Sequence, residues 1–151
     1  MPQIRIDSPY GPLLVTEEGD RITRLEWGGL ATGNGSALLM RAVGQLAAYF
    51  AGQRRAAFDL PLALMPGLTG AVQRAMLAIP FGQTRRYGDL ARDLGVPAQA
   101  ICQACGANPI PILVPCHRIL SATGLGGFSA PGGVETKVAL LKLEGAASLL
   151  I

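Results

Sequence analysis

The sequence has 151 residues, of which 50% are apolar and 15% charged, and its formal net charge is +3. This composition excludes a disordered tail and supplies enough apolar residues for a core without disulfides. No run reaches the roughly 18 uncharged apolar residues that a membrane-spanning helix needs. The first residues, Met1 to Arg5, lack the apolar core of a secretion signal. We therefore expect a cytoplasmic protein with no membrane partner.

The positive charge is unevenly placed. Six basic residues balance six acidic ones through Met65, whereas seven basic residues face four acidic ones after it. A surplus of this size fits a modest set of phosphate contacts but is weak evidence alone. Three cysteines, an odd number, argue against a disulfide framework and fit a reducing compartment.

Residues 1–64 are predicted to form an α+β domain. Short β-type runs at Ile4, 13–15 and 22–27 are separated by turn-rich segments. Apolar residues at helical spacing predict a helix over 38–51, ended by glycine. A brief extended piece over 58–62 then leads to a junction at 65–67, so the second domain is predicted to cover 65–151.

The second domain is predicted to be mostly helical. Helices are expected over 69–79, with Thr69 as the N-cap, and over 87–94 and 97–106. The last two resemble a helix-turn-helix, whose second helix would enter a DNA groove, although many helical hairpins bind nothing. The prolines at 109 and 111 predict an extended path toward residue 116. A final helix is expected over 134–144.

Cys116 precedes the only histidine of the chain, His117, which is followed by Arg118. An imidazole and a cation beside a thiol lower its pKa, so this pattern predicts a nucleophilic thiolate. Neighbouring side chains in an extended chain point to opposite sides. We therefore expect His117 to take the proton through a bridging water. Glu144 is the better candidate than Glu135 to orient the other ring nitrogen.

Two other features invite a cofactor and are interpreted otherwise. A zinc site at Cys102 and Cys105 would need the adjacent Cys116 and His117 as further ligands, and neighbours rarely reach one tetrahedral ion. A redox pair should follow a strand, whereas this pair lies in a predicted helix, with Cys105 facing inward. The glycine-rich segment 124–133 lacks a phosphate-binding pattern and suits close approach of a flat ligand. No metal or cofactor is expected.

These motifs together resemble one family. Residues 115–118 (Pro-Cys-His-Arg), preceded by 108–111 and followed by 127–129, Lys137 and 143–145, are similar to the O6-alkylguanine-DNA alkyltransferases, also called methylated-DNA–protein-cysteine methyltransferases. The likeness is strong over 69–146 and looser before it. It implies an α+β fold, with a small ribonuclease-H-like N-terminal domain and a helical domain carrying a winged-helix-like helix-turn-helix.

The resemblance also implies an activity. A monomer would bind double-stranded DNA that contains O6-alkylguanine, flip the damaged base and transfer its alkyl group irreversibly to Cys116, once per molecule. O4-alkylthymine is left open as a second substrate. The resemblance implies that Cys116 is the SN2 nucleophile, that His117 removes its proton through a water, and that Glu144 holds the imidazole. Asn108 would brace the turn before the active site, and Lys137 would support the charge on sulfur. Tyr87 would press on the rotated phosphate and help to protonate the leaving guanine oxygen.

Further residues are implied to contact substrate or DNA. Pro111 and Phe128 would form pocket walls, and the Ser129 amide would contact the guanine oxygen. The carbonyls of Cys116 and Ile119 would read the exocyclic amine. The DNA side would also include Arg86, Gln99, Ala100 and Arg118.

Two departures from the family are visible. Gln99 stands where relatives usually carry an arginine that fills the gap left by the flipped base, which predicts weaker and more salt-tolerant DNA binding. The chain also has no spare histidines for the zinc site of some relatives.

Two other functions compete with this interpretation. A module that recognises alkylated bases without repairing them is one alternative, but its known examples lack the cysteine. A Cys-His hydrolase is the other. It would need a positioned oxyanion hole, which the sequence does not show, and it would leave the helix-turn-helix unexplained.

Overall fold

The computed structural model describes residues 2–29, 35–121 and 132–146, and it divides the chain into two compact units, 1–64 and 65–151. Both units are mixtures of helices and small sheets, as the α+β interpretation requires. Within the described ranges, no helix combines the length and the apolar character needed to cross a membrane.

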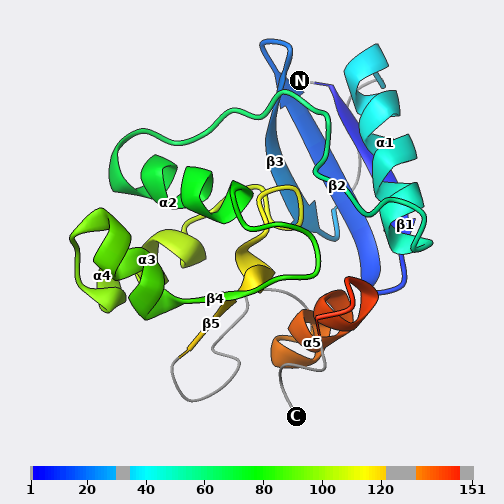
Figure 1. The fold of residues 1–151 in the computed structure, drawn as a ribbon. Helices are drawn as coiled ribbons and strands as arrows, with labels where there is room; N and C mark the ends of the chain where they lie inside the picture. The colour runs from blue at the N-terminus through cyan, green and yellow to red at the C-terminus, as the bar shows by residue number, and fades with distance from the viewer. Residues whose placement is uncertain (1, 30–34, 122–131, 147–151) are drawn as a thin grey trace. The chain divides into compact units, whose positions relative to one another are not determined.

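The first unit is an antiparallel sheet with a helix along one face. Strands β1 (Gln3–Ser8), β2 (Gly11–Glu18) and β3 (Arg21–Trp27) pair in that order, and α1 (Ala37–Phe50) lies beside them (Figure 1). Ser36 caps α1, where its hydroxyl accepts a hydrogen bond from the Leu39 amide at 3.1 Å. The predicted piece at 58–62 joins the sheet through one bridge, from Ile22 to Leu62. The core between sheet and helix includes Leu13, Val15, Leu25, Leu39 and Leu46.

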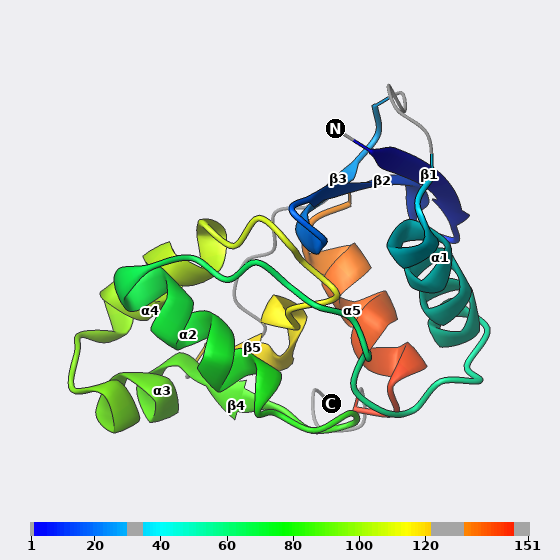
Figure 2. The same cartoon turned by 90° about the horizontal axis from the view of Figure 1, so that it is seen from above.

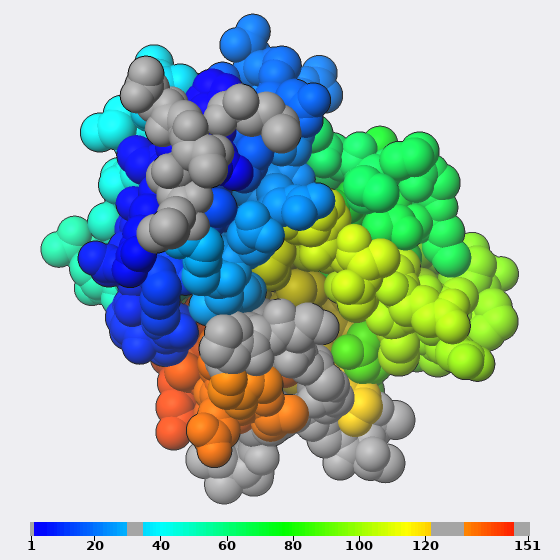
Figure 3. All heavy atoms as spheres, turned by 180° about the vertical axis from the view of Figure 1, so that it is seen from behind, coloured from blue at the N-terminus to red at the C-terminus, as the bar shows by residue number. Residues whose placement is uncertain are grey.

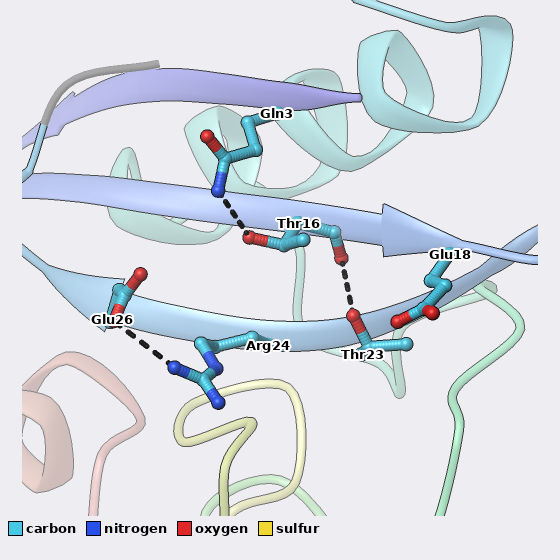
Figure 4. Close-up of a pocket in the computed structure, with 6 residues that line it drawn as sticks. All are labelled: Gln3, Thr16, Glu18, Thr23, Arg24 and Glu26. Atoms are coloured by element: carbon cyan, nitrogen blue, oxygen red, sulfur yellow. Dashed lines mark hydrogen bonds and ion pairs between the residues drawn. The ribbon is translucent and has the colours of Figure 1, made fainter. Parts of the chain in front are cut away.

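The opposite face of this sheet is polar. Because side chains alternate along a strand, Gln3, Thr16 and Arg24 point away from the face that carries Ile4 and Val15. They line a pocket of about 260 Å³ together with Glu18, Thr23 and Glu26 (Figure 4). The lining groups bind one another: Gln3 donates to Thr16 at 3.1 Å, and Arg24 pairs with Glu26 at 3.8 Å.

The second unit is mainly helical (Figure 2). Its α2 begins directly after Pro66, so Thr69 lies inside the first turn and is not the N-cap, and the helix ends at Leu77 rather than at 79. Two strands of two residues each, at 85–86 and 119–120, pair in parallel, and the sequence did not predict them. The elements are α2 (Gly67–Leu77), β4 (Arg85–Arg86), α3 (Tyr87–Leu94), α4 (Ala98–Gly106), a 3₁₀ turn (Cys116–Arg118), β5 (Ile119–Leu120) and α5 (Val134–Leu143).

The helical hairpin predicted over 87–106 is present as α3 and α4. Gly95 ends α3 with φ of 68°, a left-handed conformation that costs glycine little, and Pro97 stands before the first turn of α4. The hairpin buries Leu90 and Ile101. Ala91 and Ala104 are buried with them, and the other residues are partly or fully exposed; part of this surface is yellow-green in Figure 3. The hairpin therefore has an exposed side that could meet a ligand.

The start of α2 requires a glycine at position 70. A Cβ at Gly70 would lie 1.8 Å from the Met65 carbonyl oxygen, whereas a Cβ at Gly44 in α1 would meet nothing within 4 Å. We expect Gly70→Ala to lower the free energy of unfolding by about 2 kcal/mol or more, because the backbone must shift. Gly44→Ala should raise it by about 0.5–1 kcal/mol through helix propensity. Urea denaturation of both variants checks this, and equal effects would contradict the close approach.

Candidate active site

The Cys-His-Arg segment forms a 3₁₀ turn and not the expected extended chain. The Cys116 amide donates to Val114 O at 2.8 Å, and the Arg118 amide donates to Pro115 O at 3.0 Å. This turn sends His117 and Arg118 into the interior, where they are 0% and 7% exposed, and leaves Cys116 partly exposed. Cys116 thereby keeps some exposure as a residue, while its two neighbours are held in the core.

Both buried side chains bind the same carboxylate. Glu144 follows α5 as its C-cap and is 1% exposed. Its Oε2 lies 2.6 Å from His117 Nε2, as the sequence predicted. Arg118 donates from Nε to Oε1 at 2.7 Å and from Nη2 to Oε2 at 3.1 Å. Hydrogen bonds and charge from these two partners hold the Glu144 pKa at about 2, against the opposing effect of burial. Glu144 is therefore an anion at neutral pH.

The arrangement determines which nitrogen of His117 can act as a base. An ionised carboxylate only accepts hydrogen bonds, so the imidazole carries its proton on Nε2. The other nitrogen, Nδ1, is buried and has no hydrogen-bond partner among the residues that the structure describes. Burial also lowers the His117 pKa, more than Glu144 raises it. His117 is thus a neutral base with its free lone pair on Nδ1.

The thiol itself is protonated at rest, contrary to the sequence-based expectation of a thiolate. Burial raises the pKa of Cys116, and this effect outweighs the hydrogen bond from the Asn108 side chain, the charge of Lys137 and the amides of Cys116 and Ile112, all of which lower it. The sequence showed the cationic neighbours but not the burial. A protonated thiol needs a base before it can act as a nucleophile, and the lone pair on His117 Nδ1 can accept its proton.

Two residues that sequence reasoning missed shape the loop before Cys116. Ile112 has φ of 71°, a left-handed conformation that costs a β-branched residue roughly 1–3 kcal/mol. Its amide is directed at the Cys116 sulfur. Gln73 is fully buried on α2 and binds Asn108. A glutamine between the buried Val72 and Met76 was a visible signal of such a role, whereas nothing in the sequence marks the backbone of Ile112.

Lys137 and Tyr87 are placed around the sulfur. Lys137 is 0% exposed, and its Nζ donates to Ile119 O at 2.5 Å. Burial lowers the Lys137 pKa, and interaction with Cys116 opposes that change. Tyr87, the first residue of α3, is partly buried, and this burial, with smaller contributions from the cysteines, raises its pKa to about 12. The phenol therefore keeps its proton at neutral pH.

The residues expected on DNA are divided between surface and interior. Arg118 is the clearest exception, because its guanidinium binds Glu144 and Ile79 O (2.8 Å from Nη1) and lies 5.7 Å from the Phe81 ring centre. This interior position does not suit a DNA contact. Phe128 and Ser129 lie outside the described residues. Arg86 and Gln99 are exposed, Ala100 and Pro111 are partly exposed, and Ile119 is buried.

The other two thiols are separate from this arrangement of acid and base. Cys102 is exposed on α4, and Cys105 faces inward, with its sulfur 3.8 Å from Met76 Sδ. Across residues 2–29, 35–121 and 132–146, no three His, Cys, Asp or Glu side chains gather where they could hold a metal ion. The inward position of Cys105 agrees with its interpretation as a packed helix residue.

Comparisons with known proteins match this architecture. Residues 4–64 match the model for the ribonuclease-like domain of 6-O-methylguanine DNA methyltransferase, and residues 68–146 match its DNA binding domain. A methylated-DNA–protein-cysteine methyltransferase of Mycobacterium tuberculosis is 41% identical over 92% of this chain and 89% of the relative. A Thermus thermophilus relative, called a DNA base-flipping protein, is 38% identical over 93% of this chain and 98% of its own length.

Solved structures agree with these matches. The crystal structure of Mycobacterium tuberculosis OGT in complex with DNA has a TM-score of 0.81 and 40% identity, and the match covers 95% of this chain and 92% of that one. The structure of an O6-methylguanine DNA methyltransferase from Methanococcus jannaschii has a TM-score of 0.66 and 25% identity, over 94% of this chain and 93% of that one.

The ionised Glu144 should make stability depend on pH. Its pKa falls from 4.5 to about 2 on folding, so its stabilisation is complete above 4.5 and is lost as pH drops toward 2. We expect the difference in unfolding free energy between the wild type and Glu144→Gln to shrink by about 2 kcal/mol between pH 5 and pH 3. Urea denaturation at the two pH values measures this. The exposed Glu135→Gln is the control, and a constant Glu144 difference would contradict the assignment.

Proposed function

The chain belongs to the 6-O-methylguanine DNA methyltransferase family, and from that premise we propose that it repairs DNA by moving an alkyl group from O6-alkylguanine to Cys116. The observation that carries this proposal is the joint placement of a partly exposed cysteine, a neutral imidazole whose Nδ1 has no partner within the described part of the chain, and a buried carboxylate that fixes the imidazole. A thiol so placed needs only a substrate with an electrophilic alkyl carbon.

The proposed reaction begins with removal of the thiol proton. His117 Nδ1 takes it through one water, and the resulting imidazolium is stabilised by Glu144, whose carboxylate already binds Nε2 at 2.6 Å. The charge that develops on sulfur meets the Asn108 side chain, the amide of Ile112 and the cation of Lys137. These groups favour the thiolate as it forms, in a site where burial disfavours it at rest.

The sulfur then displaces guanine from the alkyl carbon. A new S–C bond forms as the C–O bond breaks, and the bonding electron pair leaves with the guanine oxygen. The imidazolium returns its proton to guanine through water, so the products are the thioether and neutral guanine. Tyr87, whose pKa is about 12, keeps its proton and serves as a hydrogen-bond donor to the leaving oxygen. An alkyl thioether has no carbonyl for water to attack, so each molecule acts once.

DNA binding is assigned to the exposed side of the α3–α4 hairpin. We place α4, with Gln99 and Ala100 near its start, in a groove, and Arg86 ahead of α3 on the backbone. A partly buried sulfur reaches a base only when the base leaves the stack, so the substrate is proposed to be a flipped nucleotide. Arg118 is reassigned from DNA contact to support of Glu144.

The finer features of the fold are part of the same proposal. A sheet flanked by α1 supports a ribonuclease-H-like first unit, and the α3–α4 hairpin with the β4–β5 pair supports a winged-helix-like second unit. We also propose that the protein acts as a monomer in the cytoplasm. The free thiols of Cys102, Cys105 and Cys116 suit a reducing compartment.

Transfer should be seen directly as a mass change. After incubation with a duplex containing O6-methylguanine, we expect one added methyl group per protein molecule, on the peptide with Cys116, and none on further incubation. Cys116→Ala should lose the transfer and keep duplex binding. Loss of methyl from DNA with an unmodified protein would exclude the reaction. A wild type that binds the damaged duplex without any transfer would instead support the alternative, a module that only flips bases.

The residue at position 99 should set the salt dependence of binding. Each phosphate neutralised by a basic residue adds about 0.9 to the slope of log affinity against log salt. We expect Gln99→Arg to tighten duplex binding at low salt and to steepen this slope by up to about 0.9, the value for one additional phosphate contact. Fluorescence anisotropy across a salt series measures it. Gln53→Arg, an equal charge change at an exposed position of the first unit, is the control, and identical slopes for both variants would remove Gln99 from the interface.

A further inference from the structure

The buried amide of Gln73 has two partners in the second unit. Its Oε1 accepts a hydrogen bond from the Met65 amide at 2.7 Å, and its Nε2 donates to Asn108 Oδ1 at 3.1 Å. The side chain is 0% exposed. A buried polar group is costly unless it is hydrogen-bonded, and here both ends of the amide are used. Gln73 thus connects the start of the second unit to the residue that contacts the reactive sulfur.

Asn108 has a defined orientation as a result. Its Oδ1 accepts from Gln73 Nε2 and from the Ile110 amide, each at 3.1 Å, which occupies both lone pairs. Its Nδ2 donates to Val114 O at 3.2 Å, and the same carbonyl accepts from the Cys116 amide. The remaining hydrogen of this amide group is available to the Cys116 sulfur, which the Asn108 side chain contacts.

We propose that Gln73 is a positioning residue for alkyl transfer, which fixes the Asn108 amide so that its nitrogen, and not its oxygen, faces the Cys116 sulfur. The inference rests on the proposed role of Cys116 as the alkyl acceptor. Gln73 acts on the reaction only through Asn108 and touches neither substrate nor sulfur.

The orientation matters because the two ends of an amide have opposite effects on a thiolate. An N–H group stabilises the negative sulfur, whereas a carbonyl oxygen at the same place would repel it. Without Gln73, the Ile110 amide and the Val114 carbonyl still oppose a flip of Asn108, but one of the two hydrogen bonds to its oxygen is lost. The other titratable groups that act on the sulfur or its base are Tyr87, Cys105, His117, Lys137, Arg118 and Glu144.

The test replaces the donor of Gln73 by an acceptor with the same shape. In Gln73→Glu, a protonated carboxyl can still donate to Asn108 Oδ1, whereas an ionised carboxylate can only accept and favours the flipped amide. The probe is iodoacetamide, with labelling of the Cys116 peptide followed by mass spectrometry between pH 6 and pH 9. We expect a rate close to that of the wild type at pH 6 and about tenfold below it at pH 9. The exposed Gln53→Glu should match the wild type throughout.

Two further variants separate positioning from a merely structural role. In an Asn108→Ala background, addition of Gln73→Glu should no longer change the labelling rate, because the path through Asn108 is gone. Gln73→Met cannot carry a charge, and, in samples that a melting curve shows to be folded, it should slow labelling by the same factor across this pH range. A rate ratio for Gln73→Glu that is constant with pH, an undiminished effect without Asn108, or an unchanged labelling rate in Gln73→Met would each overturn the proposal.

The iodoacetamide measurement does not depend on DNA repair. If the wild type transferred no alkyl group from damaged duplex, the proposed function would fail, while the labelling profile would still decide whether Gln73 controls the sulfur. If transfer occurred and the profile of Gln73→Glu matched that of the wild type, only the positioning role would fail.

Discussion

The buried carboxylate of Glu144 is the constraint on which the reactive centre depends. It lies between an imidazole and a guanidinium, both of them removed from water, and it makes three hydrogen bonds to them. Each partner alone would be costly to bury: Arg118 as an uncompensated charge, His117 with both nitrogens unsatisfied. Two hydrogen bonds from Arg118 fix the position of the carboxylate, and the fixed carboxylate holds the His117 ring in one tautomer.

This anchoring explains why the thiol can remain neutral and still be a nucleophile. A thiolate present at rest would be exposed to any passing electrophile or oxidant, whereas a protonated thiol beside a neutral base reacts when a substrate occupies the site. Burial raises the thiol pKa, and the groups that would stabilise a negative sulfur are already in place around it. The same surroundings therefore suppress the charge before the reaction and favour it during the reaction, when the leaving group draws electrons from sulfur.

The loop from Asn108 to Cys116 delivers those groups at some cost in backbone conformation. Ile112 takes a left-handed conformation that a β-branched residue rarely adopts, and the surrounding hydrogen bonds hold it there. The side-chain amide of Asn108 accepts a hydrogen bond from the Ile110 amide and donates one to the Val114 carbonyl. Gln73 on α2 holds this side chain in place by donating to its oxygen. Stability in this part of the second unit and reactivity of its thiol thus come from one hydrogen-bonded network.

Local patterns in the sequence were sufficient for the α-helices of both units and for the three strands of the first, because periodicity and turn residues act over a few positions. They did not indicate the two-residue strands β4 and β5 of the second unit. They did indicate Cys116, His117 and the pairing with Glu144, since a single histidine beside a cysteine and an acidic residue ending an apolar helix are visible without a fold. Only the tertiary structure decided the protonation of the thiol, the interior role of Arg118 and the contribution of Gln73. The protonation of the thiol depends on burial, and the roles of Gln73 and Arg118 depend on partners 35 and 26 residues away along the chain. A pKa or a hydrogen bond in the interior is determined by neighbours in space rather than by neighbours in sequence.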